Sequence, residues 1–229
     1  MFKNDSTMIL FKALSQDFCA EAINHSHANK KLVPSIFIDY VIWNLPAVVT
    51  CPGRTAHCEG ACYARKAEKA YPTCLPSRER NLQITKESTF VRNMVYTILK
   101  RRFYSRKKLL VVRIHESGDF YSRKYAFDWL EIMRIIESTG EKIRFIAYTK
   151  SFSFFDGVKL PKCFSLRASV WDDTPAEYLE MIKKNGWTIY TAVEKFSDSD
   201  AFTRCRCEDC SSCLQCLNGN AKVIACEIH

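Results

Sequence analysis

The sequence predicts an α/β protein with a parallel sheet, arranged as a partial (β/α)5-6 barrel and followed by a cysteine-rich C-terminal segment. Short apolar runs alternate with stretches in which apolar residues recur at helical spacing, as in a sheet built from right-handed crossovers. The chain has 229 residues, whereas a complete eight-stranded barrel typically needs about 250, so five or six strands fit better. Without a Pro/Gly-rich linker, one domain is expected. Its helical N-terminal section, β/α core and cysteine-rich tail are expected over residues 1–45, 46–200 and 201–229.

Each element is predicted from its residue pattern. The run Leu-Leu-Val-Val-Arg-Ile is broken only by Arg113 and suits a largely buried parallel strand. Residues 121–138 carry apolar side chains at helical spacing, and residues 175–185 follow Asp173 or Thr174 as the N-cap. The expected elements are strand 47–50, helices 60–71 and 79–102, strand 109–114, helix 121–138, strands 143–148 and 163–167, helix 175–185 and strand 187–193.

Cysteine usage argues against a secreted disulfide scaffold. The twelve cysteines are clumped, and 47% hydrophobic residues suffice for a core without disulfide staples. The N-terminus begins Met-Phe-Lys-Asn-Asp-Ser, and no stretch approaches the roughly 18 apolar residues of a membrane span. We therefore expect a cytoplasmic protein with no membrane segment, whose closely spaced thiols bind metal. The isolated cysteines, expected to be small buried side chains, are Cys19, Cys74, Cys163 and Cys226.

A first metal-binding group is predicted at Cys51, Cys58 and Cys62. These three thiols lie within twelve residues on a loop that runs into a helix, whose N-terminal amides stabilise thiolates. A [4Fe-4S] cluster held by three cysteines keeps one iron open, and an open position makes a metal catalytic. Zinc with His57 or Cys74 as a fourth ligand is the competing assignment, because thiolates bind both metals.

A second metal-binding group is predicted in the C-terminal segment. Its Cys-x-x-Cys-x-x-Cys-x-x-Cys run resembles the spacing of bacterial ferredoxins and favours a second [4Fe-4S] cluster over zinc. One cluster needs four thiols, so either Cys205 or Cys207 is left over. The candidate ligands are Cys205, Cys207, Cys210, Cys213 and Cys216.

Three titratable residues, His115, Glu116 and Asp119, directly follow the expected strand 109–114. Groups this close shift one another's pKa values and can share a cation, so they are candidate catalytic acids and bases. The structural alternative makes Asp119 a helix cap and pairs Glu116 with a surface arginine. Because loops after parallel strands share one face, we expect these residues to surround one pocket with the first cysteine group.

A basic run from Lys100 to Lys108 raises the question of a phosphate-bearing partner. The chain has a formal net charge of +9, and such a run attracts nucleic acid without specifying one. It equally suits a solvated helix end before a strand.

Several motifs together resemble the phage and plasmid family called gene product eighty-eight. They are Cys51-Pro-Gly-Arg-Thr, Cys58, Cys62-Tyr-Ala, His115-Glu-Ser-Gly-Asp-Phe, Tyr148-Thr and the closing cysteine-rich segment. The resemblance extends from about Cys51 to the C-terminus. It implies a phage protein, located in the host cytoplasm if it is phage-encoded.

More distantly, the layout resembles the radical S-adenosylmethionine (SAM) superfamily, in which a three-cysteine loop after the first strand binds a [4Fe-4S] cluster that chelates SAM. Six and three residues separate the cysteines here, rather than three and two, and the aromatic residue follows the last cysteine instead of preceding it. In that superfamily a Gly-Gly-Glu-like motif follows the second strand. The cofactor-binding residues that the resemblance implies are Tyr63, Ser117, Gly118, Asp119, Thr149 and Ser169.

Three functions are therefore weighed. The first is a radical-SAM-like iron–sulfur enzyme acting on a nucleic acid, nucleotide or peptide and fed by an electron donor. The second is a zinc-bearing, non-catalytic nucleic-acid-binding module, in which Tyr63, Tyr71 and Trp171 stack bases. The third is a redox or iron–sulfur carrier. Iron with acid-labile sulfide favours the first over the second.

Overall fold

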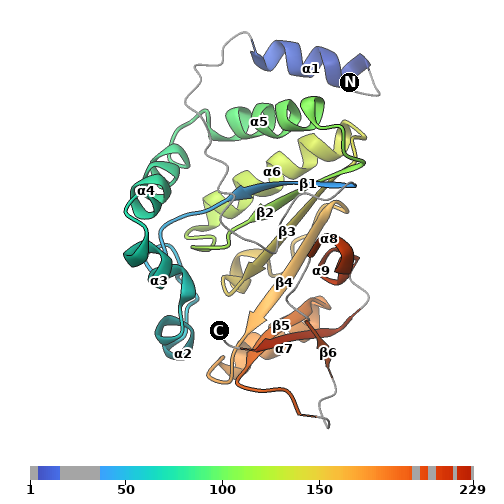
Figure 1. The fold of residues 1–229 in the computed structure, drawn as a ribbon. Helices are drawn as coiled ribbons and strands as arrows, with labels where there is room; N and C mark the ends of the chain where they lie inside the picture. Colours follow the sequence, from blue (N-terminus) through green and yellow to red (C-terminus); the bar gives the residue numbers. More distant parts are fainter. Residues whose placement is uncertain (1–4, 16–36, 198–201, 206–209, 219–220, 228–229) are drawn as a thin grey trace.

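The computed structural model describes residues 5–15, 37–197, 202–205, 210–218 and 221–227. Its centre is a seven-stranded sheet in the order β1-β2-β3-β4-β5-β7-β6, and every pair of neighbouring strands is parallel (Figure 1). The predicted α/β class is thus confirmed. The strand count exceeds five or six because the cysteine-rich tail adds β6 and β7. The strands are β1 (Ile38–Trp43), β2 (Leu109–Ile114), β3 (Ile143–Thr149), β4 (Phe164–Val170), β5 (Thr188–Val193), β6 (Thr203–Arg204) and β7 (Val223–Glu227).

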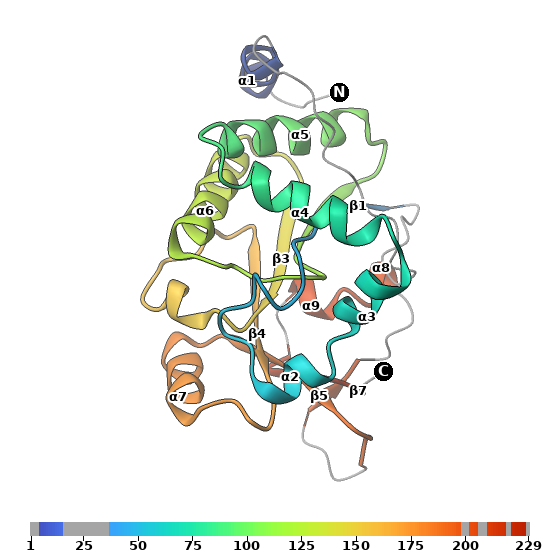
Figure 2. The same ribbon diagram turned by 90° about the vertical axis from the view of Figure 1, so that its left-hand side faces the viewer.

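From β1 to β5 the chain winds across the sheet in one direction. Right-handed crossovers in such an order place the connecting helices on a single face. Figure 2 shows α6 and α7 on one side of the sheet and α8 and α9 on the other. The helices are α1 (Asp5–Ser15), α2 (Ala56–Gly60), α3 (Tyr63–Ala70), α4 (Cys74–Ile84), α5 (Phe90–Tyr104), α6 (Arg123–Ser138), the 3-10 helix η2 (Phe152–Phe155), α7 (Ala176–Asn185), α8 (Cys210–Cys213) and α9 (Gln215–Asn218).

The main core lies between the sheet and helices α5 and α6. Alternate residues of the strands point into it, among them Trp43, Val112 and Phe145, which have no exposed surface. From α6, Trp129 is equally buried, and the Tyr125 hydroxyl accepts a hydrogen bond from Trp43 Nε1 at 3.0 Å. Burying large aromatic side chains stabilises this layer strongly. The opposite face, called the open face below, carries a smaller apolar cluster that includes Tyr40, Val111 and Ile146.

The strand expected at residues 47–50 is absent, and β1 lies earlier, inside the section that was expected to be helical. Val48 has a φ of 67°, and the Cys51 amide donates to the Val48 carbonyl at 3.0 Å, so this segment is a turn. A β-branched residue in the left-handed region is strained. The β1 strand contains the buried Asp39, whose charge is paired with Arg101 at 2.7 Å.

Two helix expectations also need correction. The helix expected over 79–102 is two helices, because the Thr85 hydroxyl donates to the Leu82 carbonyl at 2.7 Å and the chain turns before α5. Neither Asp173 nor Thr174 caps α7 with its side chain, since Pro175 is the N-cap. The Asp173 carboxylate accepts from the His57 amide instead.

In the part of the chain that the structure describes, no helix is both long enough and apolar enough to cross a bilayer.

Candidate functional site

The first cysteine loop lies after β1 and continues through two helices. Cys51 follows the strained turn, Cys58 lies in α2, and Cys62 is the N-cap of α3. The Thr55 side chain caps α2 by accepting from the Cys58 amide at 3.3 Å. All three thiols are only partly exposed and form no disulfide.

The three thiols of this loop lie within electrostatic reach of one another. Burial, together with the nearby Asp119, Cys58 and Cys62, raises the pKa of Cys51 to about 12. Burial also raises the pKa of Cys58, while the nearby Lys150 ammonium lowers it. In the metal-free chain these two groups are therefore protonated thiols at neutral pH. A bound metal would have to displace their protons.

Two glycines allow the loops after β1, β2 and β3 to pack against each other. A Cβ on Gly53 would lie 2.2 Å from the Lys150 carbonyl oxygen, and one on Gly118 would lie 2.5 Å from Thr50 Oγ1. Gly118 also has a φ of +79°, which disfavours any other residue. This packing brings the first cysteine loop against the ends of β2 and β3.

His115, Glu116 and Asp119, which follow β2, lie in different environments. His115 is 3% exposed, has a φ of 64°, and its Nε2 lies 2.9 Å from the Tyr125 hydroxyl in the aromatic core. Burial lowers the pKa of His115 to about 3, so the ring is neutral at physiological pH. The backbone of Glu116 is bound by Asn44 and Tyr63, because its amide donates to Asn44 Oδ1 at 2.7 Å and its carbonyl accepts from the Tyr63 hydroxyl. His115 thus lies apart from the thiols.

Asp119 ties the loop after β2 to the loop after β3. Its carboxylate accepts four hydrogen bonds, from Phe120 N at 2.7 Å, Thr149 Oγ1 at 2.6 Å, Lys150 N at 2.8 Å and Ser151 N at 3.2 Å. Burial raises the pKa of Asp119, and these hydrogen bonds act in the opposite direction. Asp119 does not cap α6, because the N-cap is Ser122, whose side chain accepts from the Tyr125 amide.

The other cofactor-binding candidates differ in whether their side chains bond within the protein or face solvent. The Ser117 hydroxyl donates to the Leu45 carbonyl at 2.8 Å, and Thr149 is occupied by Asp119. Ser169 accepts from Lys150 Nζ at 2.7 Å. The ring of Tyr63 is exposed, whereas burial of its hydroxyl raises the pKa to about 12.

A loop after β4 holds the first cysteine loop from the far side. His57 Nδ1 lies 2.7 Å from Asp172 Oδ1, and the His57 amide donates to Asp173 Oδ2 at 2.8 Å. The His57 ring also meets Trp171 edge-on at 4.8 Å. The Lys150 ammonium lies 5.6 Å from the centre of the same indole. These contacts place Trp171 beside Lys150 and the thiol loop.

The second cysteine group lies at the open face of the sheet. Burial raises the pKa of Cys210 to about 11; Arg113 lowers it, and Cys205, Cys216 and Cys213 raise it. These four thiols are therefore close enough to interact. The fifth predicted ligand, Cys207, lies outside the described residues.

Arginines on the open face contact the segment of the second cysteine group. The sequence analysis did not identify them as site residues. The Arg167 side chain donates to the Cys216 carbonyl, and Arg144 donates to the Leu217 carbonyl at 2.9 Å. The Arg113 guanidinium lies 3.8 Å from the centre of the Tyr148 ring. The sequence feature that could have identified them is the single arginine in each of the apolar strands β2, β3 and β4. A charge in an apolar strand needs a polar partner, so each arginine indicates a polar contact on the sheet.

Arg113 and Tyr148 lie beside the second cysteine group, and Arg113 is also close to Tyr63 of the first cysteine loop. Burial raises the pKa values of Tyr63, Cys210 and Cys216, and the Arg113 charge partly offsets each of these rises. Tyr63 directly follows Cys62. Burial raises the pKa of Cys216, while a hydrogen bond from Tyr148 lowers it. Arg113 is thus within electrostatic reach of the segments that carry both cysteine groups.

The basic run lies elsewhere, near the amino end of β2. Arg101 pairs with Asp39, and Arg102 pairs with Glu141 at 3.2 Å. These two arginines therefore form ion pairs within the protein.

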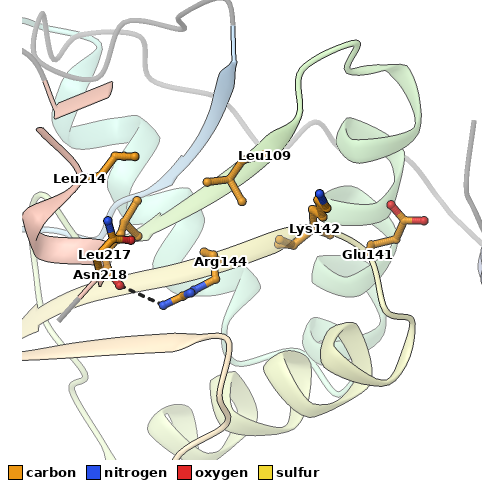
Figure 3. Close-up of a pocket in the computed structure, with 8 residues that line it drawn as sticks. Leu109, Glu141, Lys142, Arg144, Leu214, Leu217 and Asn218 are labelled. Atoms are coloured by element: carbon orange, nitrogen blue, oxygen red, sulfur yellow. Dashed lines mark hydrogen bonds between the residues drawn. The ribbon is translucent and has the colours of Figure 1, made fainter. Parts of the chain in front are cut away.

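Figure 3 shows a cavity of about 290 Å³ between the amino ends of β2 and β3 and helix α9. Leu109, Lys142, Arg144, Leu217 and Asn218 are among its lining residues, which include no cysteine. This cavity borders the second cysteine group, because Leu214 and Leu217 stand on either side of Cys216 in the sequence.

Within the described ranges, no three His, Cys, Asp or Glu side chains converge as ligands of one metal ion. Fold and site together define a parallel α/β protein with two sets of thiols near the carboxyl ends and open face of its sheet. The chain belongs to the Gene product 88 family, whose profile matches residues 14–227.

Two phage proteins illustrate the relationship. The Gene 88 protein of Mycobacterium phage L5 is 30% identical over 107 residues, which cover 44% of this chain and 43% of the phage protein. The Gene 88 protein of Mycobacterium phage D29 is 24% identical over 201 residues, which cover 76% and 81% respectively. No solved structure matches the chain significantly.

Proposed function

We propose that this protein is an iron–sulfur protein with two cluster sites, laid out like a radical SAM enzyme. Cys51, Cys58 and Cys62 would hold an open-site [4Fe-4S] cluster, and the C-terminal cysteines an auxiliary one. The observation that carries the proposal is one thiol set after β1, beside Asp119 and Lys150 at the carboxyl ends of the parallel strands, and a second set beside Arg113 and Tyr148 on the open face. Active sites of parallel α/β folds are built at that edge.

The chemistry of the donor sets fits such clusters. Both sets consist of partly buried thiols, which are soft ligands suited to iron–sulfur clusters. A cubane cluster distributes its thiolates over separate iron atoms, so its ligands need not converge on one point as those of a single ion do. Three protein ligands leave one iron open, and when bound such a cluster supplies an electron and a coordination position.

Support for SAM itself is narrower than support for a cluster. Ser117, Asp119, Thr149 and Ser169 are occupied by hydrogen bonds within the protein, and Gly118 is packed against Thr50 and Leu45. The exposed ring of Tyr63 is therefore the most accessible member of the implied set. His115 is neutral and buried, so its role in this proposal is to shape the strand end. Reduction of the clusters would require an external electron donor, and a nucleotide or nucleic acid remains the proposed substrate class.

The zinc-bearing nucleic-acid-binding module has less support. Arg101 and Arg102 form ion pairs with Asp39 and Glu141. Less positive charge of the basic run is therefore available to bind phosphates.

The proposal is tested by purifying the protein without oxygen and assaying iron, acid-labile sulfide and zinc. About eight irons and about eight sulfides per chain are expected for two cubane clusters. Burial raises the pKa of Cys51 to about 12, so cluster assembly has to remove a proton from this thiol. Cluster reconstitution of the metal-free protein should therefore be more complete at roughly pH 8.5 than at roughly pH 6.5. Zinc with negligible iron would refute the proposal and favour the binding module.

A further inference from the structure

Lys150 is a buried cation at the centre of the candidate site. It follows β3 directly and is 7% exposed. Its Nζ donates to Ser169 Oγ at 2.7 Å and to the Ser169 carbonyl at 3.3 Å, and it lies 5.6 Å from the centre of the Trp171 ring. The loop after β4 thus fixes the ammonium in place.

This ammonium has no carboxylate partner among the described residues. Asp119 is next to it, but the carboxylate accepts from the Lys150 backbone amide and not from Nζ. The remaining ion pairs of the described chain lie elsewhere. A buried ammonium is costly unless negative groups lie nearby, so the side chains that face Lys150 determine its role.

The groups that face Lys150 come from the first cysteine loop and from the loops after β2 and β4. Its charge interacts most strongly with Cys58, followed by Asp119, Asp173 and Cys51. The Trp171 ring beside the ammonium also meets the ring of His57, the residue before Cys58, at 4.8 Å. The close approach of Gly53 to the Lys150 carbonyl holds the loop against it. These thiols carry negative charge once they bind metal.

We propose that Lys150 is a positioning residue that supplies the counter-charge to Cys51 and Cys58 in their metal-bound, thiolate form. The inference deepens the proposed function, since it assigns the first cysteine loop a built-in cation. Ser169 and Trp171 hold the ammonium, and Lys150 acts on the bound metal through the thiolates. Fixed charges near a cluster are among the determinants of its stability and potential.

The test compares the Lys150→Met variant with the Lys142→Met variant. Lys142 is an exposed lysine directly before β3 and serves as the control. The full chain, reduced and freed of metal with a chelator, is alkylated at low ionic strength with anionic iodoacetate or neutral iodoacetamide. The ratio of the two rates at Cys58, measured by peptide mass spectrometry, reports the local potential and is independent of the thiolate fraction. Loss of Lys150 should lower this ratio about fivefold. The ratio at the exposed Cys213 should be unchanged in both variants.

An unchanged iodoacetate-to-iodoacetamide ratio at Cys58 would overturn the inference. Circular dichroism verifies the fold, and Lys150→Gln, which keeps a donor for Ser169, replaces the methionine variant if that variant is unfolded. Lys150→Arg should retain most of the wild-type ratio. In the anaerobically purified protein, Lys150→Met should also lose iron to a chelator faster than Lys142→Met. Absence of iron from the wild type would refute the proposed function alone, because the alkylation ratio is measured without metal.

Discussion

Substitution of Asp119 by alanine is expected to destabilise the protein by about 3–5 kcal/mol, lowering the melting temperature by about 10 °C. The carboxylate is 4% exposed and accepts four hydrogen bonds from the segments on either side of it. Removing it leaves three buried donors without this acceptor, since the Ser151 amide keeps its bond to Thr149 Oγ1, and it disconnects the loop after β2 from the loop that carries Lys150. Thermal and urea unfolding followed by circular dichroism measure the change.

Matched variants separate this structural role from catalysis. Asp119→Asn retains an acceptor oxygen and should lose about half as much stability. Asp128→Ala removes a single ion pair with Lys124 on the surface of α6 and should change stability by about 0.5 kcal/mol or less. A stability loss in Asp119→Ala no larger than that in Asp128→Ala would contradict the structural role and return Asp119 to the catalytic candidates.

Replacing Cys210, Cys213 and Cys216 together by alanine is expected to remove about four irons per chain and to release the C-terminal segment. The described part of this segment is attached to the sheet by hydrogen bonds from Ser165, Arg144 and Arg167 to backbone carbonyls of α9. The same segment is also anchored by the pairing of β7 with β5, but α8 and α9 are only 4 residues each, so a bound cluster would supply further stabilisation to this helical part. Limited proteolysis should therefore cut the tail about tenfold faster in the variant.

The control for the C-terminal variant also replaces three cysteines. The combined Cys74→Ala, Cys163→Ala and Cys226→Ala variant alters thiols outside both predicted ligand sets and should keep its iron and its protease resistance. Equal iron content and equal tail cleavage in the two triple variants would show that the C-terminal thiols bind no cluster.

The parallel sheet was predictable because its central strands are continuous apolar runs. The residues of β2 were predicted without error, and β3 was predicted to within one residue. The first strand was not, because Asp39 interrupts it and its pairing with Arg101 is a long-range contact that no local pattern reveals. Ala47–Val48–Val49–Thr50 has strand-forming residue types, but tertiary packing holds Val48 in a left-handed turn.

The candidate site was predictable where spacing carries the signal. The cysteine groups follow from their spacing, and the loops after the strands do meet at one edge. The direction of a single side chain is a different matter, since the inward orientation of His115 depends on its φ of 64°. The roles of Lys150 and Arg113 depend on which face of the sheet each occupies, and this was fixed only when the register of the strands was known.

The central claim is that Cys51, Cys58 and Cys62 hold an iron–sulfur cluster, and one comparison tests it most directly. Iron and sulfide are assayed in the anaerobically purified wild type and in the variant with all three cysteines replaced by alanine, alongside an ultraviolet–visible spectrum. The account predicts about eight irons in the wild type and about four in the variant. Equal iron content in the two proteins, or zinc as the sole metal of the wild type, would contradict it.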